Sequence, residues 1–256
     1  MVDKLKRITF TRYFIQFVAL LGLNANFFQF RSVCVPAMNC HSCPAATFAC
    51  PVGVLINFCT LRIFPFVALG IIGLAGTLFG RLWCGFICPF GLLQDLLHKI
   101  PGRKVRLPRF LGYTKWVLLG GLVFALPLLY PHLNVSYCTL CPVGTLESAI
   151  PWAITGASSP WRIMFAVRVA VLVGIIALAV VASRSFCRVF CPLGAMLSLF
   201  NRFSFWRIRQ ENLSCNTCGQ CAKRCPVEID PMAEMNNGEC VRCLNCTTRC
   251  LKLGVK

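Results

Sequence analysis

Two runs of cysteine near the end of the sequence constrain the fold of this chain more than any other feature. Each run has the spacing C-x2-C-x2-C-x3-C, and the runs consist of Cys215, Cys218, Cys221 and Cys225 and of Cys240, Cys243, Cys246 and Cys250. This spacing is typical of bacterial ferredoxin domains, in which the fourth cysteine of each run binds the [4Fe–4S] cluster of the other run. The sequence therefore predicts two clusters, one on Cys215, Cys218, Cys221 and Cys250 and one on Cys240, Cys243, Cys246 and Cys225.

Zinc binding and a disulfide framework are the alternative roles for these runs. A zinc ribbon uses pairs with the spacing C-x2-C, and such pairs leave the third and fourth cysteines of each run without a role. Pro226 follows Cys225 as the ferredoxin motif requires, whereas Leu251 follows Cys250 and departs from the motif. We therefore keep the iron–sulfur prediction.

Apolar stretches dominate the chain before the cysteine runs. Hydrophobic residues make up 57% of the sequence and the mean hydropathy is +0.70, as expected for a membrane protein. We expect four spans, at residues 13–30, 64–80, 116–130 and 163–182, the first as a retained signal anchor. Their lengths are near the lower limit for a hydrocarbon core of about 30 Å.

The predicted fold is an all-α membrane bundle over residues 1–205, with about four transmembrane helices and signs of internal duplication. A small α+β double [4Fe–4S] ferredoxin domain of the bacterial type follows over residues 206–256.

The formal net charge of +18 does not indicate nucleic-acid binding, because the basic residues lie in the loops between apolar stretches. With four spans, 22 of the 26 Lys and Arg residues fall at the two termini and in the 81–115 loop. The positive-inside rule then predicts a multi-pass protein of the cytoplasmic (inner) membrane. Both termini and the ferredoxin domain would face the cytoplasm, a reducing compartment.

A short unit, C-P-x-G, occurs four times among the other cysteines, beginning at Cys50, Cys88, Cys141 and Cys191. Two copies have a second cysteine four residues earlier, which places both thiols on one helix face and indicates a duplicated redox site. We predict one site from Cys84, Cys88, Cys187 and Cys191, and a second on the far face from Cys34, Cys40, Cys43, Cys50, Cys138 and Cys141. Thiolates are soft ligands and favour iron–sulfur clusters over hard cations.

Other roles stay open for these membrane-edge cysteines. They could be structural, since a buried thiol behaves as a small hydrophobic group, and this is the favoured interpretation for the unpaired Cys59. The far-face cysteines could also form disulfides in an oxidising compartment, and Cys138 and Cys141 could act as a metal-free dithiol.

Few other polar residues point to chemistry, and no catalytic residue is predicted. Glu147 is the only acid between Asp95 and Glu211, and we interpret it as an exposed loop carboxylate, although a quinone site would need a proton acceptor near the membrane boundary. His41, between Cys40 and Cys43, could be a metal ligand or a solvated loop residue. The sequence contains no Walker A motif and no dinucleotide-binding glycine fingerprint.

The combination of two C-x3-C-P motifs at 84–89 and 187–192, four spans and a C-terminal double ferredoxin run resembles the NapH-type quinol dehydrogenase membrane subunits and the NosR-type polyferredoxins. The resemblance implies electron transfer between the quinone pool and a partner oxidoreductase. Membrane lipid, quinone, and partner redox subunits or ferredoxin-type carriers would be its partners, and catalysis of a named reaction would belong to the partner subunits. Two alternatives stay open. One is an electron-donating assembly or regulatory factor for a metalloenzyme, and the other is a thiol-redox or metal-transfer membrane protein.

Overall fold

The computed structural model describes residues 2–25, 33–132, 135–155, 162–210, 219–247 and 251–255. The described chain is mostly helical, with one two-stranded sheet. Its α-helices are α1 (Val2–Leu23), α2 (Pro51–Thr60), α3 (Phe66–Phe79), α4 (Leu82–Phe86), α5 (Pro89–Leu97), α6 (Thr114–Leu118), α7 (Leu126–Leu129), α8 (Tyr137–Leu140), α9 (Pro142–Gly144), α10 (Ile150–Ile154), α11 (Arg162–Val181), α12 (Ser185–Val189), α13 (Pro192–Phe200) and α14 (Gln220–Lys223). The 3-10 helix η1 (Arg109–Tyr113), the π-helices η2 (Leu119–Ala125) and η3 (Thr145–Ala149), and the strands β1 (Trp206–Gln210) and β2 (Leu251–Val255) complete the list.

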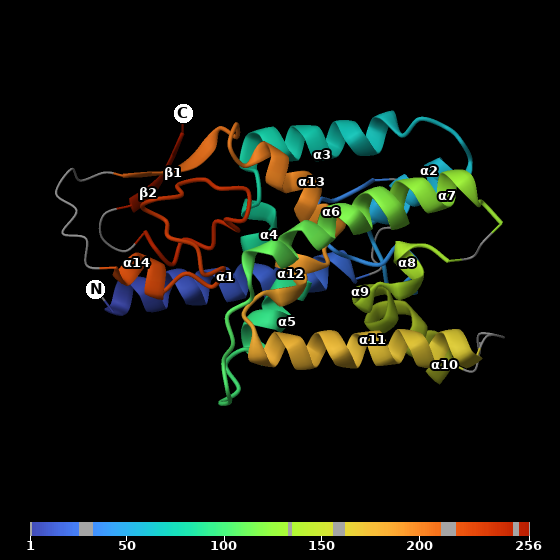
Figure 1. Ribbon diagram of the computed structural model, residues 1–256, viewed down its shortest axis with the longest axis horizontal. Coiled ribbons are helices and arrows are strands. Elements are labelled where there is room, and N and C mark those ends of the chain that lie inside the picture. The colour runs from blue at the N-terminus through green and yellow to red at the C-terminus, as the bar shows by residue number, and fades with distance from the viewer. Residues whose placement is uncertain are drawn as a thin grey trace.

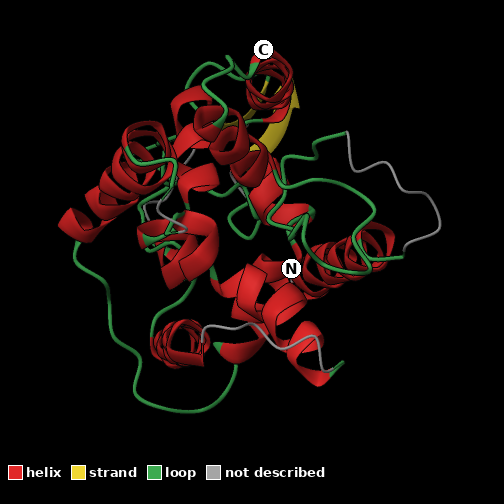
Figure 2. Cartoon of the chain, turned by 90° about the vertical axis from the view of Figure 1, so that its right-hand side faces the viewer, coloured by secondary structure: helices red, strands yellow, loops and turns green. Residues whose placement is uncertain are grey.

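The long helices run along the long axis of the molecule (Figure 1). Seen from one end, they surround the shorter helices (Figure 2). Two helical stretches are long and apolar enough to cross a membrane, Arg109–Leu129 and Ile163–Val181, and they coincide with the third and fourth expected spans. The second expected span forms α3, which has 14 residues, so its length of about 21 Å is less than a typical hydrocarbon core. Residues 13–23 of the first expected span belong to α1, which does not pass the same test, and residues 26–30 lie outside the described residues. The described structure therefore supports two of the four expected spans.

Each π-helical segment lies just before a proline, Pro127 after η2 and Pro151 after η3. Proline has no N–H group and its ring collides with the carbonyl four residues earlier, so the preceding turn widens. Pro127 explains why the stretch Arg109–Leu129 is a continuous helix with an irregular hydrogen-bond pattern rather than a regular α-helix.

The two C-x3-C-P motifs fold in the same way. Cys84 lies in α4 and Cys88 precedes α5, while Cys187 lies in α12 and Cys191 precedes α13. Proline occupies the first position of α5 and of α13, where its missing N–H costs no hydrogen bond. The two halves therefore contain equivalent pairs of short helices, as the repeated motif predicts.

The C-terminal segment, defined here as residues 206–255, begins and ends in the two-stranded sheet. β1 pairs antiparallel with β2, with Trp206 opposite Val255 and Ile208 opposite Leu253. Ile208 and Leu251 are buried and pack against Cys246. The sheet thus holds the last described residues of the chain beside the start of the C-terminal segment. In Figure 1, α4 and α12 lie between this segment and helices α8 and α9.

Candidate metal centres

Four cysteines of the C-terminal segment line one small cavity, and we refer to them as the C-terminal cysteine site: Cys225, Cys240, Cys243 and Cys246. Cys225 belongs to the first run and the other three belong to the second, which is the grouping that crossed ligation requires. Burial raises the pKa of Cys240 to about 11. A bound metal would offset this burial, since it deprotonates its thiol ligands.

Three of the four cysteines of the other predicted cluster, Cys215, Cys218 and Cys250, lie outside the described residues. The fourth, Cys221, has its Sγ 3.8 Å from the carbonyl oxygen of Cys246 and packs against the C-terminal cysteine site. This cluster stays a prediction.

The two C-x3-C-P motifs meet in the core and form the central cysteine site: Cys84, Cys88, Cys187 and Cys191. Each of the four is at most 6% exposed, and all belong to one buried cluster. Burial, and then the nearby thiols of Cys187 and Cys84, raise the pKa of Cys88 to about 12. Thiols that are separated by about 100 residues in sequence therefore lie within electrostatic reach of one another.

Backbone N–H groups point at the thiols that precede α5 and α13. The Gly194 N–H donates to the Cys191 Sγ at 3.3 Å, and the Gly91 N–H donates to the Cys88 thiol in the same way. Any side chain at these glycines would crowd the first cysteine of the same repeat, because an added Cβ would lie 3.0 Å from the Cys84 carbonyl oxygen at Gly91 and 3.2 Å from the Cys187 carbonyl oxygen at Gly194. Such N–H donors stabilise a negatively charged sulfur ligand.

Two buried arginines cross between the repeats. The Arg81 Nη2 donates to the Cys187 carbonyl oxygen at 2.9 Å, and the Arg184 Nη1 donates to the Cys84 carbonyl oxygen at 3.3 Å. Each arginine precedes the first cysteine of its own repeat by three residues but contacts the first cysteine of the other repeat. The sequence analysis missed both, although the shared pattern R-x2-C-x3-C-P-x-G was present as a signal.

Each of these arginines shares one carboxylate with a second cation. Asp95 accepts two hydrogen bonds from Arg184, at 2.9 and 2.7 Å, and one from Arg12 at 2.8 Å. Burial alone would raise the pKa of Asp95, but Arg184 and then Arg12 hold it below its ordinary value. On the other side, Glu239 pairs with Arg81 and with Lys115. The surroundings of the central cysteine site therefore have more positive than negative charge, which suits thiolate ligands.

Two glutamines complete the polar surroundings. The Gln94 Nε2 lies 3.2 Å from the Cys187 Sγ, while its Oε1 accepts from the Phe186 N–H at 3.0 Å. The Gln16 side chain donates to the Gly85 carbonyl oxygen at 3.1 Å and so holds the end of α4, just after Cys84. Outer groups of this kind orient thiolate ligands and adjust the potential of the centre that they hold.

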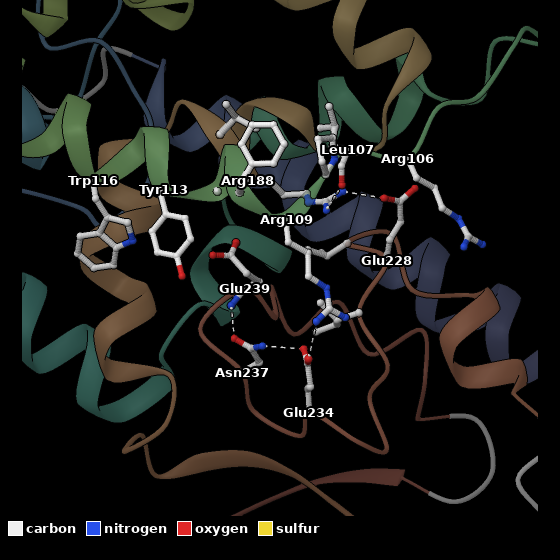
Figure 3. Close-up of a pocket in the computed structure, with 16 residues that line it drawn as sticks. Arg106, Leu107, Arg109, Tyr113, Trp116, Arg188, Glu228, Glu234, Asn237 and Glu239 are labelled. Atoms are coloured by element: carbon white, nitrogen blue, oxygen red, sulfur yellow. Dashed lines mark hydrogen bonds and ion pairs between the residues drawn. The ribbon is translucent and has the colours of Figure 1, made fainter.

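The C-terminal segment packs directly against the central cysteine site. A Cβ added at Gly85, the residue after Cys84, would overlap the carbonyl oxygen of Val241 in the C-terminal cysteine run. Around this contact, three glutamates of the segment pair with cations of the helical part: Glu228 with Arg188, Glu234 with Arg109, and Glu239 with Arg81 and Lys115. Figure 3 shows the first two pairs at a cavity of about 630 Å³ between the two parts.

Four of the six far-face cysteines line a second cavity, of about 350 Å³, and form the distal cysteine site: Cys40, Cys50, Cys138 and Cys141. The other two do not line it, since Cys34 lies behind Cys50 and the Cys43 Sγ is 3.8 Å from the Asn24 Oδ1. Cys59 lies away from both membrane-edge sites, which agrees with its interpretation as a small hydrophobic residue.

Glu147 is not the exposed loop carboxylate that the sequence suggested. It lies in η3, is half-buried, and accepts a hydrogen bond from the Cys40 N–H at 2.7 Å. Burial raises its pKa to about 7, an effect that this hydrogen bond opposes. His41 lies beside Gly53 and lines the cavity of the distal cysteine site. Across the ranges that the structure describes, no three His, Cys, Asp or Glu side chains converge closely enough to hold one metal ion.

The family of 4Fe-4S binding domains matches this chain twice, over residues 61–108 and 164–210. Each match contains one C-x3-C-P motif and one of the crossing arginines. An uncharacterized protein of Methanocaldococcus jannaschii is 30% identical over 183 residues, which cover 68% of this chain and 70% of that protein. The chain belongs to this 4Fe-4S binding family.

Two further relatives are a ferredoxin-type protein and a regulatory protein. The methylamine utilization ferredoxin-type protein MauN of Paracoccus denitrificans is 30% identical over 57% of this chain and 48% of its own length. The regulatory protein NosR of Stutzerimonas stutzeri is 29% identical over 66% of this chain and 23% of its own length. The chain thus spans at most about half of these two relatives. The resemblance to the NosR and NapH type that the motifs suggested is confirmed, and no solved structure matches the chain.

Proposed function

We propose that this protein is an integral membrane electron-transfer protein that passes electrons between the quinone pool and a partner oxidoreductase. The main support is the direct packing of the C-terminal cysteine site on the central cysteine site, at Gly85 and Val241. Two cysteine sites in contact through backbone atoms provide a short path for one-electron transfer. Its family membership supports the same function.

In this proposal Cys84, Cys88, Cys187 and Cys191 bind a [4Fe–4S] cluster, in which each thiolate binds a different iron, so the four thiols need not converge as closely as the ligands of one metal ion do. Such a cluster accepts and donates one electron at a time. In this proposal Gly91 and Gly194 donate N–H groups toward its ligands, and Gln94 does so through its side chain. Arg81 and Arg184 hold the two repeats together and supply positive charge, which favours the reduced, more negative state.

Crossed ligation in the C-terminal segment predicts which cluster a single substitution damages. Because Cys225 shares its cavity with the three cysteines of the second run, Cys225→Ser should remove or alter the cluster of Cys240, Cys243 and Cys246. The cluster that includes Cys221 should keep its signal. Electron paramagnetic resonance of the reduced protein distinguishes the two, and damage confined to the Cys221 cluster would contradict the assignment.

We propose the quinone site at the cavity in Figure 3, where the helix Arg109–Leu129 meets the C-terminal segment. Its lining includes Val189, between the cysteines of α12 and α13, and Glu239, next to Cys240. A ring bound there would therefore lie close to both cysteine sites. Tyr113 and Trp116 offer aromatic surfaces, and Arg106 and Arg109 offer donors for quinone oxygens.

The test uses protein reduced with dithionite in lipid vesicles and then mixed with a soluble quinone analogue. The clusters should be reoxidised, as followed by their absorbance, and Tyr113→Ala should slow this step roughly two- to tenfold. Tyr130→Ala is the matched control, because Tyr130 is also exposed but lies at the other end of the same helical stretch. Equal rates of cluster reoxidation in Tyr113→Ala and Tyr130→Ala would show that this cavity is not the quinone site. Clusters that ferricyanide oxidises but quinone does not would reject the function.

Membrane vesicles prepared from cells test the proposed orientation, in which both termini and the C-terminal segment face the cytoplasm. This proposal depends on the position of 22 of the 26 basic residues. In Figure 1 both marked ends of the chain lie near the C-terminal segment. An impermeant amine label should reach Lys256 in inside-out vesicles and miss it in right-side-out vesicles, and the reverse pattern would overturn the orientation.

A further inference from the structure

We propose that the distal cysteine site binds an iron–sulfur cluster of its own, with Cys40, Cys50, Cys138 and Cys141 as ligands. Neither segment that the family model matches contains these residues. The site lies beyond the central cysteine site as seen from the C-terminal segment, because α8 and α9 lie on the far side of α4 and α12 (Figure 1). The proposal concerns a bound cofactor and holds whether or not quinone is the redox partner.

The four thiols come from separate parts of the chain and face one space. Cys40 and Cys50 belong to the loop before α2, Cys138 lies in α8, and Cys141 precedes α9. Two glycines line this space. A Cβ added at Gly144 would lie 3.7 Å from the Cys40 Sγ, and one at Gly53 would lie 3.7 Å from the Cys138 Sγ and 2.6 Å from the His41 Nδ1. The thiols and both glycines border one cavity of about 350 Å³.

The local geometry repeats that of the central cysteine site. Cys50 and Cys141 each precede a helix that begins with proline, as Cys88 and Cys191 do. The N–H of Gly53 donates to the Cys50 thiol, and the N–H of Gly144 donates to the Cys141 thiol. All four C-P-x-G units thus form the same thiol-binding turn, two at each site.

A cation inside an apolar helix supports a negatively charged occupant. Arg168 lies in the first half of α11, one of the two helical stretches able to span a membrane, and lines the cavity. The Arg168 Nε atom is buried, and this atom has no hydrogen-bond partner among the described side chains and backbone groups. Ionisable residues inside such helices pair with an opposite charge or face a site. A cluster with four thiolate ligands provides the negative charge that Arg168 needs.

Short backbone connections join the distal and central cysteine sites. Two consecutive residues each contact a different site. The Met38 N–H donates to the Cys88 thiol of the central cysteine site, and the Asn39 N–H donates to the Cys50 thiol of the distal cysteine site. On the other side, Tyr137 precedes Cys138, and its hydroxyl donates to the Phe190 carbonyl oxygen, beside Cys191, at 3.1 Å. One electron lost by a reduced central cluster could therefore reduce a distal one, and a redox partner at the far end, a quinone or a protein, would accept it.

The experiment counts iron and acid-labile sulfide in anaerobically purified full-length protein. Wild type should contain about 16 irons, four for each of two C-terminal clusters, one central and one distal. Cys141→Ser and Cys50→Ser should each lower the content by about four irons. The matched control is Cys59→Ser, which replaces a cysteine outside every site and should leave the iron content unchanged.

Resonance signals of the C-terminal clusters report whether a variant is folded, because those clusters lie at the other end of the molecule. The proposal is supported if these signals persist while four irons are lost. It is overturned if folded Cys141→Ser contains as much iron as Cys59→Ser, or if it loses only a single zinc or copper ion. If both distal variants fail to fold, Mössbauer counting on wild type decides, and a total of about 12 irons or fewer rejects the site.

Discussion

Cys88→Ser is expected to stop electron transfer between the C-terminal clusters and the rest of the protein while the C-terminal clusters stay bound. Cys88 is 5% exposed, faces the other thiols of the central cysteine site, and has no substitute ligand nearby in the described structure. Loss of one ligand should remove the central cluster. Electron transfer from the C-terminal clusters through the central cysteine site to an acceptor at the distal cysteine site should then become slower. The expected loss exceeds the roughly 10- to 100-fold that substitutions outside the ligand set produce.

Stopped-flow absorbance and iron analysis of the same preparation check this result. Iron should drop by about four per chain, and the C-terminal resonance signals should stay. Cys59→Ser again serves as the control, since it replaces a cysteine with a serine in a comparable apolar setting without touching a site. If Cys88→Ser keeps wild-type iron and rate, the central thiols are structural and the proposed path is wrong.

Asp95→Asn is expected to be the most destabilising single polar substitution near the central cysteine site. The Asp95 side chain is 6% exposed and is the only carboxylate that the described structure places against Arg12 and Arg184, which are themselves buried. Asparagine would leave both positive charges without compensation. Breaking a buried pair in this way costs about 3–5 kcal/mol of the free energy of unfolding. For a chain of this size the melting temperature should fall by roughly 10 °C.

Thermal unfolding in detergent, followed by loss of cluster absorbance, measures this effect. Asp230→Asn is the control, because Asp230 is exposed and makes no ion pair in the described structure. The double variant Asp95→Asn with Arg184→Gln should lose less stability than the two single changes added together, since one uncompensated charge is removed. A melting temperature of Asp95→Asn equal to that of Asp230→Asn would contradict the role of Asp95.

The local parts of this protein could be predicted from the sequence. Ligand spacing within a run is local, so the sequence placed Cys240, Cys243 and Cys246 together, and it also joined Cys225 to them across 15 residues. Each C-P-x-G unit predicted a helix that begins at its proline, because proline is favoured at that position. The two helical stretches that are long and apolar enough to cross a membrane were evident from hydropathy, whereas the 14-residue length of α3 was not.

Only the tertiary structure decided which distant groups meet. It separated Cys34 and Cys43 from the four thiols of the distal cysteine site, and it moved Glu147 from an exposed loop to a hydrogen bond with the Cys40 N–H. It also brought Arg81 and Arg184 each into contact with the first cysteine of the other repeat, and it placed Asp95 in an ion pair with Arg184. Sequence spacing fixes the positions of residues within one helix or turn. Contacts between residues 100 positions apart depend on how two helix pairs pack, and the burial that makes their charges matter arises only after packing.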